Sequence, residues 1–595
     1  MKTKVINDWL EKFEKSIKEK NIDAILDLFD EETYWRDLIS FTWNIITLES
    51  KEDISLMLNK TIDKINPENF KIQKMLTINS DVHEARFTFD TTTSKCIGHI
   101  RLTNGKCKTL LTVTEELKGY EENKGYKREL GTEFGFFKDR KNWLEKRNIE
   151  IQNLEENKNP YCLIVGGGQG GLALAARLRQ LNVPTIVIDK NKNPGDSWRN
   201  RYHSLCLHDT VWYDHMPYLL FPDHWPIFSP KDKIGDWLEM YAKIMEINYW
   251  GSTECLKASY DQEKQVWEVI ADREGNKIKL TPRHLILATG MSGIPQFPEI
   301  KNIEKFQGDY CHSSKFKNGY EYRGKNVVIV GSNNSAHDIG AELWEQGAAN
   351  VTMIQRSPTT VAKSKTLTEL SSNGVYSENA VHSGVTVDIA DITVASTPYK
   401  LTHLEGQKTV KDLNEIDKQF YVELKKSGFM FDWGEDESGL SVKYLRRGSG
   451  YYIDVGGSDL IINGEIKLES PAEVEEFKEN SVVLNNGKEI NADLVVFATG
   501  YGSMNGWAAK LISQEVADKV GKCWGLGSDT KNDPGPWEGE LRNMWKPTHQ
   551  EALWFHGGNL AQSRQYSKYL TFQLKARYEN IPFEVYGIPK VNHLS

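Results

Sequence analysis

The stretch Tyr161–Leu178 reads YCLIVGGGQGGLALAARL and begins with a short apolar run, CLIV. A glycine loop with the spacing GxGxxG follows at Gly166 to Gly171, and a helical pattern, LALAARLRQL, comes next. The segment TIVIDK then predicts a second strand. A strand, a glycine loop, a helix and a strand in this order predict a βαβ unit of the dinucleotide-binding type. The sequence therefore predicts an α/β fold.

Each glycine of this loop has a distinct physical task. Gly166 permits the turn, Gly168 lets a pyrophosphate approach the backbone, and Gly171 lets the helix pack on the strand. Asp189 lies 23 residues after Gly166, at the end of the second strand. A carboxylate there accepts hydrogen bonds from ribose hydroxyls. We therefore expect a dinucleotide with free ribose hydroxyls at this loop.

The same pattern begins again at NVVIVGSNNSAHDIGAEL, residues Asn326–Leu343. Asn333 stands where the second glycine is expected, and because asparagine tolerates a left-handed backbone we expect it to follow the turn. Ala336 still allows close packing. Arg356 lies 25 residues after Gly331, where a guanidinium suits the 2′-phosphate of NADPH. The alternative is a solvated arginine at the end of a strand.

The composition of the 595 residues is that of a globular protein, with 39% hydrophobic and 26% charged residues. The net charge is −9 without a long block of lysine and arginine, which argues against a nucleic-acid surface. We find neither an apolar run of about 18 residues nor a signal peptide. The seven cysteines form no CxxC pair, so we expect a cytoplasmic protein with no metal site and no membrane association.

The first 125 residues predict a separate α+β unit. Trp9, Phe13 and Ile17 recur at the spacing of one helix face. Two β-rich runs follow, joined by Asn104-Gly105, a dipeptide that suits both positive-φ positions of a type I′ hairpin. The expected division of the chain is a first α+β domain over 1–125, a linker helix over 126–158, a first nucleotide-binding domain over 159–322 and 456–595, and a second over 323–455.

The segment between the two loops, FQGDYCHSSKF, fits FxGxxxHxxxF with Phe306, Gly308, His312 and Phe316. This motif resembles the fingerprint of class B flavoprotein monooxygenases, specifically the flavin-containing monooxygenases, whereas the related Baeyer–Villiger enzymes end it in Trp-Pro. Four further segments resemble that family in the same order, namely GDSWRNRYHSLCLHD, LILATG, LVVFATGY and LWFHGGNLAQSRQYSKYL. The resemblance covers residues 155 to 595.

The resemblance implies an enzyme that holds FAD at the first loop and NADPH, with NADH as an additional donor, at the second. Such an enzyme inserts one atom of dioxygen into a small organic substrate through a C4a-(hydro)peroxyflavin. The substrate could be an amine, a sulfide, a ketone or a 2-keto acid such as indole-3-pyruvate, and the sequence does not choose among them. An NADPH oxidase or flavin reductase without productive oxygenation is the alternative.

Specific residues carry over from these motifs. As groups that could act at the reacting face we single out His208, Asp209 and Asn334, while His312 is expected at the interdomain hinge. The expected cofactor-binding residues are Gly166, Gly168, Gly170, Gly171, Asp189, Lys190, Trp198, Arg199, Thr289, Gly290, Gly331, Asn333, Ser335, Ala336, Arg356, Ser357, Gly500, Asn559 and Gln562.

The N-terminal extension resembles the ketosteroid-isomerase-like (SnoaL-like) α+β cones that the type II subgroup of this family carries. In such folds Tyr34 to Trp43 would line or cap the cone. Asp37 matches a place where related cones hold catalytic acids, although a single acid is also compatible with a structural role. The expected partners are a small substrate and dioxygen, and the sequence is compatible with a homodimer.

A flavin disulfide reductase is a rival function on the same fold. It needs a redox-active cysteine pair, and the closest two cysteines of this chain, Cys96 and Cys107, are 11 residues apart.

Overall fold

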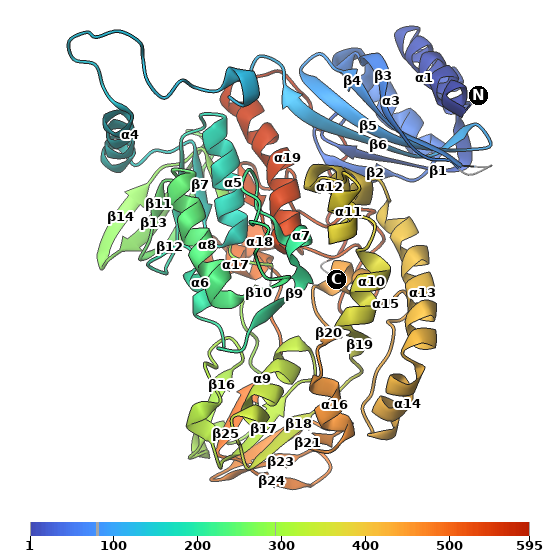
Figure 1. Cartoon of the computed structure of the whole chain (residues 1–595). Helices are drawn as coiled ribbons and strands as arrows, with labels where there is room; N and C mark the ends of the chain where they lie inside the picture. Colours follow the sequence, from blue (N-terminus) through green and yellow to red (C-terminus); the bar gives the residue numbers. More distant parts are fainter. Residues whose placement is uncertain (1, 79–81, 292, 594–595) are drawn as a thin grey trace.

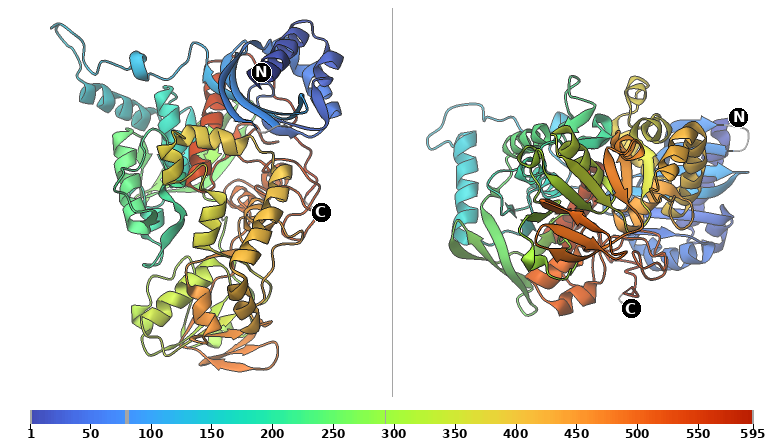
Figure 2. Two further views of the ribbon diagram at one scale, coloured as in Figure 1. Left: turned by 45° about the vertical axis from the view of Figure 1, so that its right-hand side comes forward. Right: turned by 90° about the horizontal axis from the view of Figure 1, so that it is seen from below.

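The computed structural model describes residues 2–78, 82–291 and 293–593 and contains three sheet-based units (Figure 1). The N-terminal unit lies beside the first nucleotide-type unit, and the second nucleotide-type unit lies at the opposite end of the molecule (Figures 1 and 2). A group of helices lies between the N-terminal unit and the second nucleotide-type unit.

The N-terminal unit packs three helices on a six-stranded sheet with the order β2-β1-β6-β5-β4-β3. Strands β1 and β6 are parallel, and the other neighbours are antiparallel. Its elements are α1 (Lys2–Lys18), α2 (Ile22–Leu26), β1 (Phe29–Leu38), β2 (Ile45–Leu48), α3 (Lys51–Ile65), β3 (Glu68–Ile78), β4 (Val82–Asp90), β5 (Ser94–Thr103) and β6 (Lys106–Leu117).

Aromatic side chains fill the space between the helices and this sheet. Trp9 and Phe13 of α1 stack with ring centroids 4.7 Å apart. Phe29 stacks on Trp35, and Trp35 meets the edge of Phe41 at 4.9 Å. Such rings bury large apolar areas, so the cluster forms the hydrophobic core of the unit. The predicted core-facing side of the first helix is confirmed.

The predicted hairpin is also confirmed. Asn104 and Gly105 join β5 to β6 with φ of 51° and 77°. Both angles lie in the left-handed region that a type I′ turn requires.

After β6 the chain leaves the body of the molecule and returns through α4 (Trp143–Asn157) (Figure 1). Asn142 and Glu145 form a capping box that fixes the start of this helix. The predicted linker helix is thus confirmed over residues 143–157. Residues 118–142, in contrast, contain only the 3₁₀ turn η1 (Gly125–Lys127).

The first nucleotide-type unit is built on a parallel sheet with the order β11-β8-β7-β15-β26. Every residue of β7, β8 and β15 is buried, as expected for strands covered on both faces. The sheet and the helices beside it comprise β7 (Cys162–Val165), α5 (Gln169–Gln180), β8 (Thr185–Ile188), α8 (Lys231–Ile244), β11 (Tyr249–Trp250), β15 (His284–Leu287), β26 (Leu553–Phe555) and α19 (Leu560–Tyr578).

Smaller elements surround this sheet. They are α6 (Asp196–Arg199), β9 (Cys206–Thr210), α7 (Val211–Asp214), β10 (Phe228–Pro230), and an antiparallel sheet of β12 (Thr253–Asp261), β13 (Val266–Arg273) and β14 (Asn276–Leu280). The turns η2 (Ile303–Lys305) and η3 (Tyr320–Tyr322) lie on the way to the second unit, and α17 (Asn505–Leu511) and α18 (Gln514–Val520) lie on the way back.

The second nucleotide-type unit has a parallel sheet with the order β16-β25-β17-β18-β21. Its strands run from residue 309 to residue 497, so the unit extends beyond the predicted range 323–455. It comprises β16 (Asp309–His312), β17 (Asn326–Val330), α9 (Asn334–Glu345), β18 (Asn350–Ile354), α16 (Gly457–Ile462), β21 (Ile466–Glu469), the antiparallel strands β22 (Val474–Lys478), β23 (Ser481–Leu484) and β24 (Glu489–Asn491), and β25 (Leu494–Phe497).

A helical insert interrupts the second unit between β18 and β21. It contains β19 (Thr360–Lys363), α10 (Ser364–Ser371), α11 (Glu378–His382), α12 (Val387–Ala395), α13 (Tyr399–Ile416), α14 (Lys418–Lys426), α15 (Gly439–Arg447) and β20 (Tyr451–Asp454). Strands β19 and β20 pair in parallel and close the insert at its base. This insert lies between the second sheet and the N-terminal unit (Figure 1).

Arg36 of β1 anchors the N-terminal unit to the rest of the molecule. Its Nε and Nη2 atoms donate to the two carboxylate oxygens of Glu540 at 2.6 and 2.9 Å. It also donates to Tyr566 Oη at 2.9 Å and to the carbonyl of Ala395 at 3.0 Å. The side chains of Arg36 and Glu540 are only 2% and 3% exposed. A bidentate pair of this kind fixes the orientation of the two parts.

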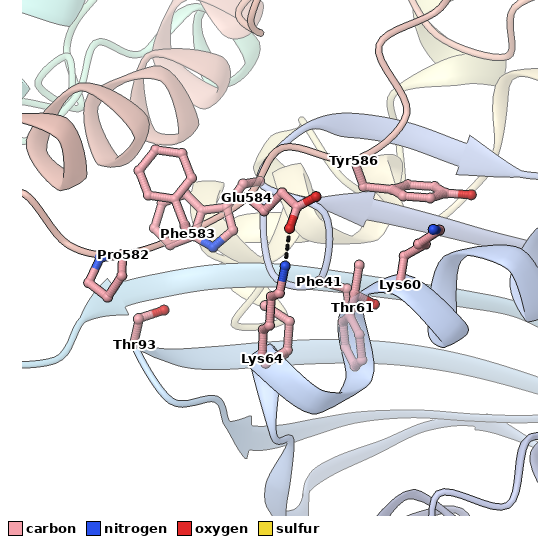
Figure 3. Close-up of a pocket in the computed structure, with 11 residues that line it drawn as sticks. Phe41, Lys60, Thr61, Lys64, Thr93, Pro582, Phe583, Glu584 and Tyr586 are labelled. Atoms are coloured by element: carbon pink, nitrogen blue, oxygen red, sulfur yellow. Dashed lines mark hydrogen bonds and ion pairs between the residues drawn. The ribbon is translucent and has the colours of Figure 1, made fainter.

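The C-terminal tail provides a second connection to the N-terminal unit. The ring of Phe583 stacks on Trp43 with a centroid distance of 4.3 Å. Glu584 pairs with Lys64 of α3, as Figure 3 shows. The amide of Tyr586 donates to the carbonyl of Thr42 at 2.9 Å. The last residues of the chain thus cover the loop that follows β1.

We predict that Arg36→Met destabilises the protein, because Glu540 would keep a buried charge without its partner. Removing one member of a buried pair costs about 3–5 kcal/mol. We expect the apparent unfolding midpoint to fall in thermal denaturation. The double variant Arg36→Met/Glu540→Leu removes both charges and should recover most of the loss. A midpoint equal to that of the unmodified protein in the single variant would contradict this assignment.

Candidate functional site

The first glycine loop takes the shape that its sequence predicts. Gly166 has a φ of 112°, and a Cβ atom on it would lie 2.3 Å from the carbonyl oxygen of Ala288. A Cβ on Gly171 would lie 1.9 Å from the oxygen of Gly166. Both positions therefore exclude any side chain, the first by its turn and the second by the contact of α5 with the strand.

Gly168 differs from these two glycines because the space around it is open. Its backbone is extended, and a Cβ atom there would meet only Ser197 Oγ, at 3.7 Å. Gly168 is also the N-cap of α5, and no side chain caps this helix end. Free amide donors at a helix N-terminus and an uncovered backbone are what a pyrophosphate needs. The loop therefore fits the FAD expected here.

Two buried hydroxyls beside the loop support this fit. Thr289 Oγ1 and Ser563 Oγ have no hydrogen-bond partner among the described residues. Thr289 belongs to the segment that passes behind Gly166, and Ser563 lies on α19 next to Gly170. Buried polar atoms are normally paired, so these hydroxyls indicate a polar ligand.

Asp189 ends β8 beside the same loop. Its carboxylate accepts hydrogen bonds from the amides of Gly167 and Asn191, each at 2.7 Å. These bonds hold the acid at the position expected for ribose recognition. The neighbouring Lys190 is exposed, and no contact directs it toward the loop.

The two predicted residues of the turn after Asp189, Trp198 and Arg199, make contacts with different parts of the fold. Trp198 donates through its indole to Gln169 Oε1 at 3.2 Å, so it lies at the start of α5. The guanidinium of Arg199 contacts three carboxylates, those of Asp196, Asp236 and Glu239. Arg199 therefore joins α6 to α8, and its contacts give no support to the predicted cofactor role.

Arg201, which was not among the predicted residues, differs from Arg199 because it forms no salt bridge with a described residue. Its side chain is half-buried, and its Nε atom has no hydrogen-bond partner among the described residues. The charge of Arg201 acts on the pKa values of Asp338 on α9 and of His312 on β16. Arg201 thus lies close enough to these two residues of the second nucleotide-type unit to act on them electrostatically. The only indication of Arg201 in the sequence is that it lies two residues after Arg199, in the same family-like segment.

The second loop repeats the close approach of the first. Gly331 has a φ of 122°, and a Cβ atom on it would lie 2.4 Å from the oxygen of Ala498. Asn333 is the N-cap of α9 and has a φ of −96°, which corrects the expectation of a left-handed asparagine. Gly331 makes the turn alone, so position 333 needs no special backbone. The side chain of Asn333 accepts a hydrogen bond from Thr359 Oγ1 at 3.3 Å.

The remaining predicted residues of the second loop lie around the start of α9. Ser335 and Ala336 belong to its first turn, with Ala336 buried. Arg356 follows β18 and is 73% exposed, with only a 3.9 Å contact to Glu473. Ser357 beside it is exposed as well. The guanidinium is therefore free to meet a phosphate, as its predicted role requires.

Asn334 is committed to the backbone of the insert. Its Oδ1 atom accepts a hydrogen bond from the amide of Ile453 at 2.9 Å. This bond attaches the first turn of α9 to β20 and so fixes the place of Tyr451 on that strand. The contact favours a positioning role over the catalytic role that we expected.

The fingerprint residues hold the segments that cross between the two nucleotide-type units. His312 Nε2 lies 3.1 Å from the carbonyl of Gly500, and its Nδ1 lies 3.0 Å from Ser314 Oγ. Phe306 packs on Phe477, and Phe316 is buried in the core of the second unit. Gly308 lies where a Cβ would be 2.6 Å from the oxygen of Asp493. Gly290 and Gly500 take positive φ values of 94° and 81° at the two crossings.

Asp209 ends β9 beside three tyrosines from distant parts of the chain. It lies within electrostatic reach of Tyr213, Tyr444 and Tyr451. Desolvation raises the pKa of Asp209, although its side chain keeps some exposed surface. His208 is likewise half-buried. Asp209 and the three tyrosines are all desolvated yet keep some exposed surface, and we call this partly accessible cluster the recess.

The start of α19 closes this recess. Asn559 caps the helix and donates to Tyr213 Oη at 3.1 Å. Gln562 Oε1 accepts a hydrogen bond from Tyr444 Oη at 2.7 Å. Both predicted residues therefore lie beside Asp209 and the glycine loop, as a flavin-edge role requires. Tyr444 and Tyr451 come from the helical insert, which carries no motif that could have identified them.

Asp214 at the end of α7 is a further buried acid. Neither of its carboxylate oxygens has a hydrogen-bond partner among the described residues. Desolvation, with the nearby charge of Asp209, raises its pKa well above the ordinary value. Burial therefore favours the protonated form of Asp214, which lies close to Asp209.

Asp37 in the N-terminal unit has a structural role. Its carboxylate accepts hydrogen bonds from Thr112 Oγ1 at 2.6 Å, from Thr42 Oγ1 at 2.7 Å and from the amides of Phe41 and Thr42. Burial nevertheless raises its pKa to about 6. The carboxylate holds the loop after β1 and makes no contact with an open surface. The catalytic hypothesis for Asp37 gains no support.

The cysteines offer no redox pair in the described ranges, where all seven are free thiols. No three His, Cys, Asp or Glu side chains gather there into a metal site. Within the same residues no helix is long and apolar enough to cross a membrane.

Comparison with known proteins gives a consistent picture. A family model described as pyridine nucleotide-disulphide oxidoreductase matches residues 163–416. The chain is 29% identical over 378 residues to indole-3-pyruvate monooxygenase YUCCA1 of Oryza sativa subsp. japonica, covering 63% of this chain and 85% of the relative. It is 26% identical to the probable indole-3-pyruvate monooxygenase YUCCA10 of Arabidopsis thaliana, covering 57% and 81%.

Solved structures show the same fold. Cyclohexanone monooxygenase with bound ε-caprolactone superposes with a TM-score of 0.52 at 16% identity, covering 71% of this chain and 88% of that one. OTEMO in complex with FAD and NADP superposes with a TM-score of 0.51 at 16% identity, covering 71% and 86%.

We predict that Gly168→Val yields a folded protein without flavin. The structure has room for the new side chain, but that side chain would occupy the space of the pyrophosphate. The measurement is the ratio of flavin to protein absorbance after purification, with circular dichroism as the test of folding. Gly168→Ala serves as the control and should lose less flavin. Full flavin occupancy in the valine variant would remove FAD from this loop.

We predict that Arg356→Ala raises the concentration of NADPH needed for half-maximal flavin reduction roughly ten- to a hundredfold. A charge-assisted phosphate contact is worth about 1.5–3 kcal/mol. NADH lacks the 2′-phosphate, so its half-saturation should change little, and this makes it the internal control. Anaerobic stopped-flow reduction with each nucleotide measures both values. Equal effects on the two nucleotides would show that Arg356 does not bind the phosphate.

Proposed function

We propose that this chain is a flavin-containing monooxygenase that oxygenates an aromatic 2-oxo acid such as indole-3-pyruvate. The chain is a flavin-dependent monooxygenase that consumes NADPH and dioxygen. The substrate class is our proposal, and it rests on the named relatives and on the free guanidinium of Arg201. The type II subgroup, with a SnoaL-like N-terminal unit, is the subgroup that we propose.

The proposed reaction is an oxidative decarboxylation. The 2-oxo acid, NADPH, a proton and dioxygen give the carboxylic acid that is one carbon shorter, carbon dioxide, water and NADP⁺. The bond between the carbonyl carbon and the carboxylate breaks, and one oxygen atom enters the product while the other leaves as water. Bound FAD and NADPH supply the redox chemistry.

The charges around the recess suit such a substrate. Arg201 supplies a cation that forms no salt bridge within 4.0 Å of a described carboxylate and whose Nε atom has no hydrogen-bond partner there, and a guanidinium recognises a carboxylate in bidentate geometry. Desolvation raises the pKa of both Asp209 and Asp214, which favours their protonated forms and weakens the repulsion between these acids and an anionic ligand.

The tyrosines supply shape and hydrogen bonds. Tyr213 and Tyr444 are oriented by Asn559 and Gln562, and Tyr451 leaves its hydroxyl without a hydrogen bond to any described residue. Aromatic walls with few polar groups favour a flat apolar side chain. A protonated Asp209 can donate a hydrogen bond to a carbonyl oxygen and keep water away from the reacting atoms.

The test compares substrates with and without a carboxylate. NADPH consumption is measured in air with indole-3-pyruvate, phenylpyruvate, a neutral ketone, an amine and a sulfide, and the products are identified with ¹⁸O₂. We expect the 2-oxo acids to give labelled acid and carbon dioxide. We also expect Arg201→Met to raise their KM at least tenfold while flavin content is kept.

Arg201→Lys is the conservative control and should retain more affinity, since it keeps the charge. If only the ketone, the amine or the sulfide is oxygenated, the proposed substrate class is wrong, whereas the monooxygenase activity is still supported. Stoichiometric hydrogen peroxide with every compound would instead favour an NADPH oxidase.

A further inference from the structure

The segment of residues 125–142, which we call the arm, exposes an unusual set of large apolar side chains. Tyr126, Phe134 and Phe136 are 111%, 85% and 97% exposed, and Leu130 and Phe137 are 73% and 55% exposed. The arm projects from the molecule between β6 and α4 (Figure 1). Large apolar groups gathered on one exposed segment mark an interaction site, whereas single exposed residues do not.

The arm makes its contacts with itself and with its own ends. Arg140 donates to the carbonyls of Glu133 and Gly135, and its guanidinium lies 5.5 Å from the ring of Phe136. Within the described chain, the side-chain hydrogen bonds and ion pairs of residues 125–142 all stay within residues 121–146. The arm thus has local structure, while none of its aromatic rings packs against the body.

The charge of the arm is opposite to that of the remaining chain. The arm contains five basic and three acidic residues, a net charge of +2, which leaves −11 for the other residues out of the total of −9. The remainder of another copy therefore carries a net charge of the opposite sign. Complementary charge favours and orients an encounter of this kind.

We propose that the arm is a dimerisation arm that docks on a second copy of this chain. Aromatic side chains bury roughly 150–250 Å² each, so the four rings of one arm would cover roughly 600 Å². A standard interface needs about 800 Å² per partner. In a two-fold dimer each copy gives one arm and receives another, so the area is reached with few additional contacts.

The arm does not fit a membrane surface as well. A membrane-surface element is typically an amphipathic helix with a basic polar face. The arm contains one 3₁₀ turn of three residues, and its acids Glu129, Glu133 and Asp139 are interspersed among the basic residues. The aromatic and charged side chains alternate along the arm, and such a pattern fits the surface of a folded protein better than it fits a membrane.

The experiment uses the full-length flavin-loaded protein in analytical ultracentrifugation from 0.5 to 50 μM. We expect a dimer for the unmodified chain. Phe134→Ser/Phe136→Ser/Phe137→Ser should sediment as a monomer with unchanged flavin content and unfolding midpoint. The matched control Phe134→Leu/Phe136→Leu/Phe137→Leu keeps apolar side chains at these positions and should remain a dimer.

Three outcomes would overturn the proposal. They are a monomeric unmodified chain over the whole range, a serine variant that remains a dimer, and a leucine variant that dissociates as fully as the serine variant. Sedimentation with phosphatidylcholine vesicles containing about 30% phosphatidylserine tests the membrane separately. Binding to vesicles that disappears in the serine variant, without a dimer in solution, would assign the arm to a membrane.

Discussion

The close approach of two glycines to two crossing segments determines where both nucleotides can bind. Gly166 lies against Ala288, and Gly331 lies against Ala498, with room for no side chain at either position. Each alanine begins an Ala-Thr-Gly sequence that carries the chain from one unit to the other. Because loop and crossing segment are in contact in both units, the loops and the crossings cannot move independently.

The nucleotide-binding units could be predicted because their signals are local. A buried strand, a glycine loop and a helix follow one another within 18 residues at Tyr161–Leu178, and the hairpin at Asn104-Gly105 depends on two residues. Asn333 shows the limit of such reasoning, since the residue type suggested a left-handed backbone that Gly331 already provides. The end of the second unit was missed for another reason. A parallel sheet accepts strands from either side of a long insert, so β21 and β25 join it from beyond residue 455.

The residues that shape the recess could not be predicted, because distant segments bring them together. Tyr444 and Tyr451 belong to the insert, Tyr213 to α7 and Gln562 to α19. Nothing in the sequence near Tyr444 indicates that its hydroxyl will meet Gln562. Arg199 and Arg201 are equivalent as sequence neighbours, and only the carboxylates around Arg199 show that Arg201 is the free one. Pairing of charges is a property of the folded chain.

The N-terminal unit reaches the recess through a continuous series of polar contacts. Arg36 donates to the carbonyl of Ala395 at the end of α12. Asp391 of the same helix holds Arg564 in a bidentate pair, with distances of 2.6 and 2.9 Å. Arg564 in turn donates to the carbonyls of Tyr213 and His215, which flank Asp214. These contacts attach the N-terminal unit to α12 and, through Arg564, to the end of α7 beside Asp214.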